Sequence, residues 1–192
     1  KIITSWNALI GIGFVMAGRY VNTNYSERAL KIFNNLLDKH HIDGQLFHSS
    51  FENSVQKESF LEDYASMLLF ATYLFDENKI ESEIMDNLFE KLVNFKIENV
   101  WYESTNSPFG KIPAAEYDHP IPSAVSMAEA AISRYKTQTN RTVEELQLKN
   151  PLTYDFFNLA VKWSNNEFAN ISSLESLDFS NLPPYIILKK GA

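Results

Sequence analysis

The sequence predicts an all-α fold: an α/α toroid fragment of about three helical hairpins, half of an (α/α)6 barrel, with short β-strands at the joins. The first observation is an internal repeat, because Trp6, Asp63 and Pro122 mark three similar segments at spacings of 57 and 59 residues. Each segment opens with a polar and aromatic cluster: residues 4–7, 60–64 and 120–123. The second observation is that an apolar helix and then an amphipathic helix follow each opener, which is typical of an inner and an outer helix.

The first repeat predicts an inner helix from residue 6 to about residue 21, apolar on almost every side and capped by Thr4 or Ser5. Each glycine in this helix costs about 1 kcal/mol of helix propensity, which indicates that other helices pack closely there. These glycines are Gly11, Gly13 and Gly18. Ser26 is expected to cap the amphipathic outer helix, which runs to about Lys39.

The second repeat follows a turn at residues 43–44 and a short strand at 45–48. Its inner helix is predicted at 61–75, and its outer helix at 81–95 has apolar residues at helical spacing. A second short strand, 100–103, occupies the same position after this outer helix as the first strand does after its own.

The third repeat follows a proline-rich loop at 105–122, and a loop of this length in a compact domain is usually functional or a lid. Its inner helix is predicted at 123–135 and its outer helix at 151–169. The remaining tail is predicted to be irregular, with one short strand at 185–188.

The toroid segment is therefore assigned to residues 1–170 and the tail to 171–192. In a toroid, the loops at one end of the inner helices meet around a central cavity, so the functional site is expected there. Half a ring leaves two apolar flanks uncovered, and we expect self-association through these flanks.

Composition limits the function classes. The chain of 192 residues is 45% hydrophobic, enough for one domain with a substantial core. Its formal net charge of −7 argues against a nucleic-acid groove, which needs a basic face. The absence of cysteine excludes disulfides and thiolate zinc sites. The longest apolar stretch, residues 8–17, is too short to span a bilayer and no signal peptide is visible, so we expect a cytoplasmic protein with no membrane partner and no cofactor.

The candidate catalytic residues are Asp63, Asp118 and Glu62. Glu62 and Asp63 begin the second inner helix, and paired carboxylates are the acid and base of glycoside hydrolysis and sugar epimerisation. Acids in a first turn also cap a helix and complement its dipole, so a purely structural role stays open. Asp118 and His119 end the proline-rich loop. They could form a proton-transfer pair near neutral pH, or Asp118 could brace the loop and His119 be exposed.

The candidate ligand-binding residues are Trp6, Asn7, His48, Tyr64, Trp101, His119 and Ser123. In a sugar site, Trp101 would stack on a pyranose face and His48 would bond a hydroxyl, although both are more often packing residues. Trp6 is expected in the cavity floor or the core. Asn7 would need a backbone or ligand partner if its amide is buried. No metal-ligand motif is found.

Several stretches are similar to a known family, and three of the motifs have its order and spacing. The stretches are 1–9 (Lys-Ile-Ile-Thr-Ser-Trp-Asn-Ala-Leu), 17–19 (Ala-Gly-Arg), 60–65 (Phe-Leu-Glu-Asp-Tyr-Ala), 117–118 (Tyr-Asp) and 121–123 (Ile-Pro-Ser). Together they resemble the C-terminal toroid of the spermatogenesis-associated protein 20 type, over about residues 1–135. In that family a thioredoxin-like domain precedes an (α/α)6 region similar to N-acylglucosamine 2-epimerases and six-hairpin glycosidases. The resemblance implies that the N-terminal region of the parent chain, with this domain and the first part of the toroid, is missing here.

One departure from the family concerns the segment after Tyr-Asp. The family typically reads Gly-Ala-x-Pro-Ser-Gly-Asn-Ser, whereas residues 119–126 read His-Pro-Ile-Pro-Ser-Ala-Val-Ser. Val125 takes the place of the asparagine, so any hydrogen bond from that amide to a ligand is lost. Two functions follow as hypotheses: a toroid that binds a sugar-like small molecule, with epimerase- or glycosidase-like acid–base chemistry, or a non-catalytic interaction module of a thioredoxin-like fusion protein.

Overall fold

A computed structural model describes residues 1–52, 54–106, 108, 110–150, 153–167, 170–173 and 178–190. These residues form six α-helices and a few short strands, which confirms the predicted all-α class. The helices are α1 (Thr4–Tyr20), α2 (Asn24–His40), α3 (Leu61–Asp76), α4 (Ser82–Leu92), α5 (Ala124–Gln138) and α6 (Asp155–Ser164). Over the described ranges, no helix has both the length and the apolar character that crossing a membrane requires.

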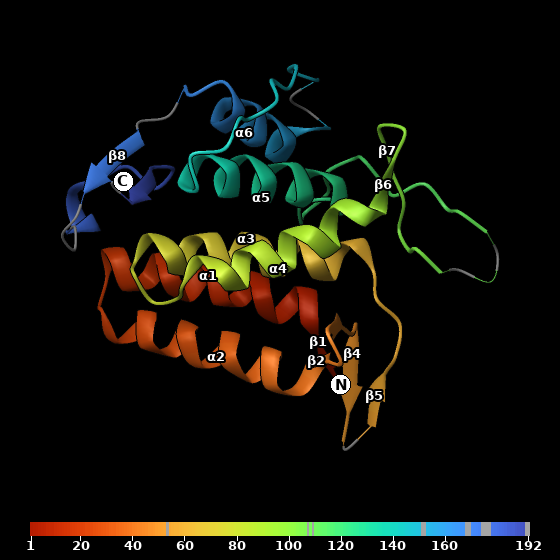
Figure 1. Ribbon diagram of the computed structural model, residues 1–192. Helices are drawn as coiled ribbons and strands as arrows, with labels where there is room; N and C mark the ends of the chain where they lie inside the picture. Colours follow the sequence, from red (N-terminus) through yellow and green to blue (C-terminus); the bar gives the residue numbers. More distant parts are fainter. Residues whose placement is uncertain are drawn as a thin grey trace.

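The helices α1, α3 and α5 pack in a row, with α3 in the middle (Figure 1). Each packs against the helix that follows it in sequence: α1 against α2, α3 against α4 and α5 against α6. The three helices of the row run in the same direction, with their N-termini toward the small strands β1 to β7 and their C-termini toward β8 (Figure 1). The loops that precede these helices therefore gather at one end of the molecule.

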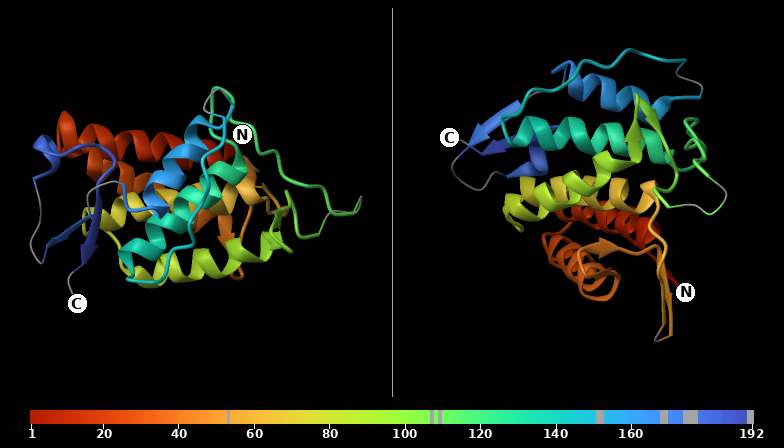
Figure 2. Two further views of the ribbon diagram at one scale, coloured as in Figure 1. Left: turned by 90° about the horizontal axis from the view of Figure 1, so that it is seen from above. Right: turned by 45° about the vertical axis from the view of Figure 1, so that its right-hand side comes forward.

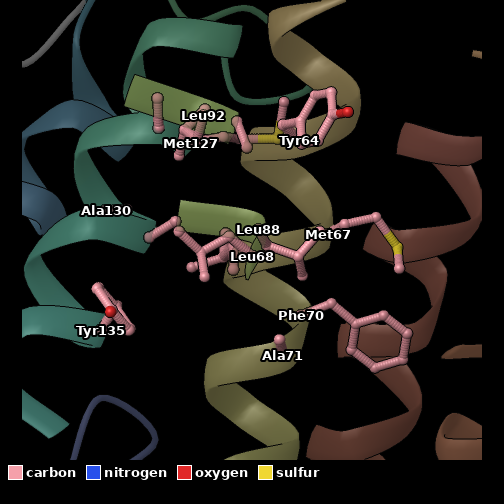
Figure 3. Close-up of a cluster of buried hydrophobic side chains, with 14 of the residues drawn as sticks. Tyr64, Met67, Leu68, Phe70, Ala71, Leu88, Leu92, Met127, Ala130 and Tyr135 are labelled. Atoms are coloured by element: carbon pink, nitrogen blue, oxygen red, sulfur yellow. The ribbon is translucent and has the colours of Figure 1, made fainter. Parts of the chain in front are cut away.

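The middle helix of the row, α3, is almost completely enclosed. Every residue of α3 except Glu62 is buried, as the apolar pattern on all its sides predicts. Phe70 points toward α1, and Met127 and Ala130 of α5 face α3 from the other side (Figure 3). A Cβ atom at Gly11 would lie 2.3 Å from the Phe70 ring, so this glycine allows α1 and α3 to approach closely.

Two short hairpins follow the outer helices α2 and α4. They consist of β2 (His41–Ile42) with β3 (Gln45–Leu46), and β6 (Lys96–Ile97) with β7 (Val100–Trp101). Both turns have positive φ at their two central residues, Asp43 (52°) with Gly44 (73°) and Glu98 (49°) with Asn99 (66°). This is the mirror-image turn that matches the twist of two-residue hairpins.

The backbone after each hairpin binds the first residue of a helix in the row. The Thr4 amide donates to the carbonyl of His48 at 2.9 Å, and the Leu61 amide donates to the carbonyl of Glu103 at 2.9 Å. The repeat seen in the sequence is thus present in the main-chain hydrogen bonds. It places His48 and Glu103 at the N-terminal ends of α1 and α3. Beside the first hairpin lies a three-stranded antiparallel sheet of β1 (Ile2–Ile3), β4 (Ser49–Phe51) and β5 (Ser54–Gln56).

Two predicted helix caps are wrong. The helix α1 already includes Thr4 and Ser5, because β1 leads directly into it. The Thr4 hydroxyl instead donates to the carbonyl of Phe47 at 2.6 Å and bonds the His40 imidazole at 2.7 Å. Ser26 lies inside α2, where a Cβ atom at Gly18 would meet its hydroxyl. Ser123 does cap α5, since its hydroxyl accepts from the Ser126 amide.

The tail contains two strands, β8 (Asn170–Ser173) and β9 (Ile187–Lys190), where an irregular segment with one strand at 185–188 was expected. These strands pair in parallel near the C-terminal ends of the row (Figure 1). Trp163 of α6 donates its Nε1–H to the carbonyl of Tyr185 at 2.9 Å, and the Tyr20 hydroxyl donates to the carbonyl of Leu182 at 3.0 Å. The outer helix predicted at 151–169 is too long, because α6 spans only Asp155–Ser164 and the described positions 153–154 and 165–167 are not helical. Positions 151, 152, 168 and 169 lie outside the described residues.

A buried ionic cluster joins the C-terminal ends of the row. Arg134 of α5 donates to the Asp76 carboxylate at 2.6 Å, and Arg19 of α1 donates to the same carboxylate at 3.2 Å. Arg19 also donates to Glu77 at 3.0 Å. The Arg134 guanidinium lies over the Tyr73 ring, 4.0 Å from its centroid. Because the charges of α1, α3 and α5 meet here, this cluster fixes the relative placement of the three helices.

Candidate functional site

A cavity of about 430 Å³ lies at the N-terminal ends of α3 and α5. Its walls come from the segment after β3, the starts of both helices and the proline-rich loop before α5. The lining residues are His48, Phe60, Leu61, Glu62, Glu103, Ala115, Tyr117, His119, Ile121, Pro122, Ser123 and Ala124. The cavity therefore lies at the end of the inner helices where the sequence predicts the site.

A histidine and a buried carboxylate form the polar base of this site. His48 Nδ1 lies 3.2 Å from both carboxylate oxygens of Asp63, which has no exposed surface. Asp63 also accepts from the Phe60 amide at 3.3 Å, as an acid in the first turn of a helix does. The Phe60 ring packs edge-on against the imidazole at a centroid distance of 5.0 Å. Asp63 thus caps the start of α3 and also bonds the imidazole that lines the cavity, although it does not line the cavity itself.

Glu62 is the carboxylate that reaches the cavity. Its Oε1 lies 3.5 Å from His48 Nδ1, and its side chain is about one-third exposed. Burial raises the pKa of Glu62, and the negative charge of Asp63 raises it further, whereas His48 and the Ser5 hydroxyl lower it. The net effect is a raised pKa, so Glu62 keeps its proton to a higher pH than an ordinary glutamate.

The pKa of the His48 imidazole is raised as well. The hydrogen bond to Asp63 is the largest influence and raises the pKa of His48, partial burial lowers it, and the charges of Asp63 and Glu62 raise it again. The net result is a raised pKa for His48. An imidazole and a carboxyl whose pKa values are both raised, side by side at a cavity, are candidates for acid–base exchange with a bound ligand.

Asp118 does not line the cavity. One of its oxygens accepts from the Ser123 amide at 2.8 Å, and the other accepts from the amides of Phe156 and Phe157 at 2.9 and 3.0 Å. Asp118 therefore ties the end of the loop to the start of α5 and caps the first turn of α6. Of the two roles open for this residue in the sequence, the structure places it in the bracing one.

His119 and Ser123 do line the cavity. His119 is exposed, and its amide donates to the carbonyl of Ile121 at 3.1 Å. The Ser123 hydroxyl donates to the carbonyl of Glu116 at 3.1 Å while it caps α5, so backbone groups already occupy it. His119 is therefore the side chain of this pair that is open to a ligand.

Four candidates lie away from the cavity. The Tyr64 hydroxyl accepts from the Leu46 amide at 2.8 Å in the core, and Trp101 Nε1–H donates to Glu129 at 2.7 Å. The side-chain N–H of Asn7 donates to the carbonyl of Ile3 at 2.7 Å, so a backbone group is the partner of this donor. Trp6 is 59% exposed on α1 and lies neither in the core nor in the cavity wall, because no described element covers that side of the helix.

Sequence reasoning missed Glu103 and Tyr117, which line the cavity. Glu103 ends the second predicted strand, at the position where His48 ends the first. The two residues are 55 positions apart, close to the period of the repeat. The repeat therefore contained a signal for Glu103. Tyr117 belongs to the Tyr-Asp motif of the resemblance, but its place on the cavity wall depends on the path of the proline-rich loop.

Three side chains could together reach a metal ion. The ligand atoms of His48, Glu62 and Asp63 all lie within 4.8 Å of one another. The imidazole nitrogen in this group is already shared with the Asp63 carboxylate, which supplies its partner without an ion. The cluster is therefore a candidate for proton exchange, with a metal site as the alternative assignment.

Comparisons with known proteins do not assign a function to this site. The chain matches no protein-family model, and no curated protein sequence matches it significantly.

Proposed function

We propose that the chain is a segment of an α/α toroid that binds a sugar-like small molecule in the cavity beside His48, with proton transfer by Glu62 and His48. The row of α1, α3 and α5, each packed against its following helix, supports the toroid. The observation that carries the function is one cavity that holds two glutamates and two histidines: Glu62, Glu103, His48 and His119.

The lining chemistry suits a polyhydroxylated ligand. Carboxylates and imidazoles exchange hydrogen bonds with hydroxyl groups, and the ring faces of Phe60 and Tyr117 offer apolar surface for the carbon face of a sugar ring. Glu62, with its raised pKa, donates a proton to a ligand oxygen, and His48, oriented by Asp63, takes up or returns a proton. A general acid and a general base in these roles are what epimerase- or glycosidase-like chemistry requires.

A thermal-shift screen of the protein against sugars and sugar phosphates tests the proposal. A ligand at a hundredfold excess over its Kd stabilises the native state by about 2.7 kcal/mol. At about 2–4 °C per kcal/mol for a domain of this size, the Tm rises by roughly 5–10 °C. The variants Glu62→Gln and His48→Gln should lose the shift, and Glu90→Gln on the exposed face of α4 should keep it. The absence of a shift with every sugar would refute the binding proposal.

A non-catalytic interaction module within a thioredoxin-like fusion protein is the second candidate. Val125, which stands where the resembling family has an asparagine, is 3% exposed and packs in the core at the start of α5. It supports the second candidate because a buried valine cannot offer an amide to a ligand. In that case the chain turns over no sugar, and its binding partner is a protein that co-purifies with it.

A further inference from the structure

One face of α1 is exposed and carries no charge. Trp6, Ile10, Gly13, Ala17 and Tyr20 follow one another at steps of four and three residues, which places them on one side of the helix. Trp6 is 59% exposed and Ile10 is 55% exposed. We call these five residues the α1 face. The helix lies along an edge of the molecule (Figure 2, left), whereas α5, the other end helix of the row, has no exposed residue.

The glycines of α1 show what the face lacks. A Cβ atom at Gly11 would lie 2.3 Å from Phe70 of α3, and one at Gly18 would lie 1.9 Å from the Ser26 hydroxyl of α2. At both positions the helix propensity lost to glycine, about 1 kcal/mol, is matched by close packing of a neighbouring helix. A Cβ atom at Gly13 would meet nothing within 4 Å. Gly13 therefore resembles the glycines at which helices cross, but no helix of the described residues packs on it.

The α1 face is self-complementary about Gly13. Trp6 and Tyr20 stand seven residues to either side, and Ile10 and Ala17 stand three and four residues away. An antiparallel copy of the helix would set Trp6 against the partner's Tyr20 and the large Ile10 against the partner's small Ala17. The two glycines would meet at the axis, where the missing Cβ atoms allow the backbones to approach. Such a surface fits a two-fold, isologous interface.

We propose that the α1 face binds the α1 face of a second copy of this chain, with the two helices antiparallel and the two-fold axis at Gly13. The occupant continues the packing already present in the structure, since the other side of α1 packs against α3 through Gly11. A face without charge needs no ionic partner, and burial of large apolar side chains drives association of this kind. This inference does not depend on the sugar site. In a longer toroid chain, a preceding helix would be the competing occupant of the same face.

Disulfide trapping tests the geometry directly, because the chain contains no cysteine. In the double variant Ile10→Cys/Ala17→Cys each new thiol faces a thiol of the second copy while Gly13 is kept, so mild oxidation should give a covalent dimer. The matched control is Asn35→Cys on the exposed side of α2, which should stay monomeric under the same conditions. Equal cross-linking of the two variants would overturn the proposal. So would cross-linking of neither.

The solution state of the unmodified chain completes the test. Light scattering or sedimentation at tens of micromolar should give a dimer. Ile10→Lys places an unpaired charge in the interface and should weaken the dimer at least about tenfold. Ile10 is exposed in a single copy, so this variant should keep the circular dichroism and the Tm of the monomeric fold. A monomeric wild-type chain would refute the proposal, and so would a dimer that Ile10→Lys leaves unchanged.

Discussion

Asp76→Asn should destabilise the protein far more than loss of a surface carboxylate. The Asp76 side chain has no exposed surface and accepts from Arg134 at 2.6 Å, from Arg19 at 3.2 Å and from Gln138 at 2.7 Å. In the described part of the chain, no other carboxylate pairs with Arg134, whereas Arg19 keeps Glu77. Removing one partner of a buried ion pair costs about 3–5 kcal/mol, because a charge is left buried without its counter-charge.

Thermal unfolding followed by circular dichroism measures this loss. At about 2–4 °C per kcal/mol for a domain of this size, the Tm should fall by roughly 6–20 °C. The control is Asp86→Asn, because Asp86 pairs with Arg141 at 2.9 Å and their side chains are 38% and 48% exposed. Asparagine keeps an oxygen for the hydrogen bond that Asp86 accepts from the Tyr135 hydroxyl. An exposed pair of this kind contributes at most about 1 kcal/mol.

A double variant isolates the cause. Asp76→Asn combined with Arg134→Leu removes both charges of this pair and keeps an acceptor for Arg19 and Gln138, so it should be more stable than Asp76→Asn alone. Equal Tm values for Asp76→Asn and Asp86→Asn would refute the reasoning. A double variant less stable than Asp76→Asn would show that the ionic contact itself, and not the unpaired charge, sets the cost.

Three further predictions concern single positions. Folding raises the pKa of His48 above 6.5, so the stabilisation from its protonation is fully present below pH 6.5 and is lost as the pH rises through the folded-state pKa. The free energy of unfolding in urea should therefore depend less on pH in His48→Gln than in the wild type. Gly11→Ala should cost about 1–3 kcal/mol of stability by overpacking against α3. Gly13→Ala, at the open position, should stabilise the monomer by up to about 1 kcal/mol. Chemical denaturation measures both, and the opposite order would contradict the packing assigned to these glycines. Asp118→Ala removes the cap of α6 and should lower the free energy of unfolding by about 0.5–2 kcal/mol. Any ligand-induced thermal shift should persist. Loss of that shift in a folded variant would show that Asp118 contributes to ligand binding.

Much of the architecture could be predicted because helical periodicity is a local signal. The inner helix predicted at 61–75 is α3 at Leu61–Asp76, and the outer helix predicted at 81–95 is α4 followed by a single 3₁₀ turn, Val93–Phe95. The ends were less predictable. Thr4 and Ser26 have the right side chains for caps, but tertiary contacts with Phe47 and Gly18 place them inside their helices.

The candidate residues that the sequence located are those whose positions the repeat indicates. Glu62 and Asp63 begin a predicted inner helix, and His48 ends a predicted short strand. The role of Asp118 depends on the amide of Phe156, 38 residues further along the chain, and no local pattern contains that contact. The exposure of Trp6 likewise depends on which side of α1 has a neighbour. An apolar pattern that covers every side of a helix does not reveal this.

The paired main-chain bonds from Thr4 to His48 and from Leu61 to Glu103 have an evolutionary consequence. Each bond uses only an amide and a carbonyl, so the repeat can hold its geometry whatever side chain stands after the hairpin. An imidazole occupies that place in one unit and a carboxylate in the next, on the rim of the same cavity. The chemistry of the rim can thus diversify one unit at a time by substitution, without redesign of the scaffold that presents it.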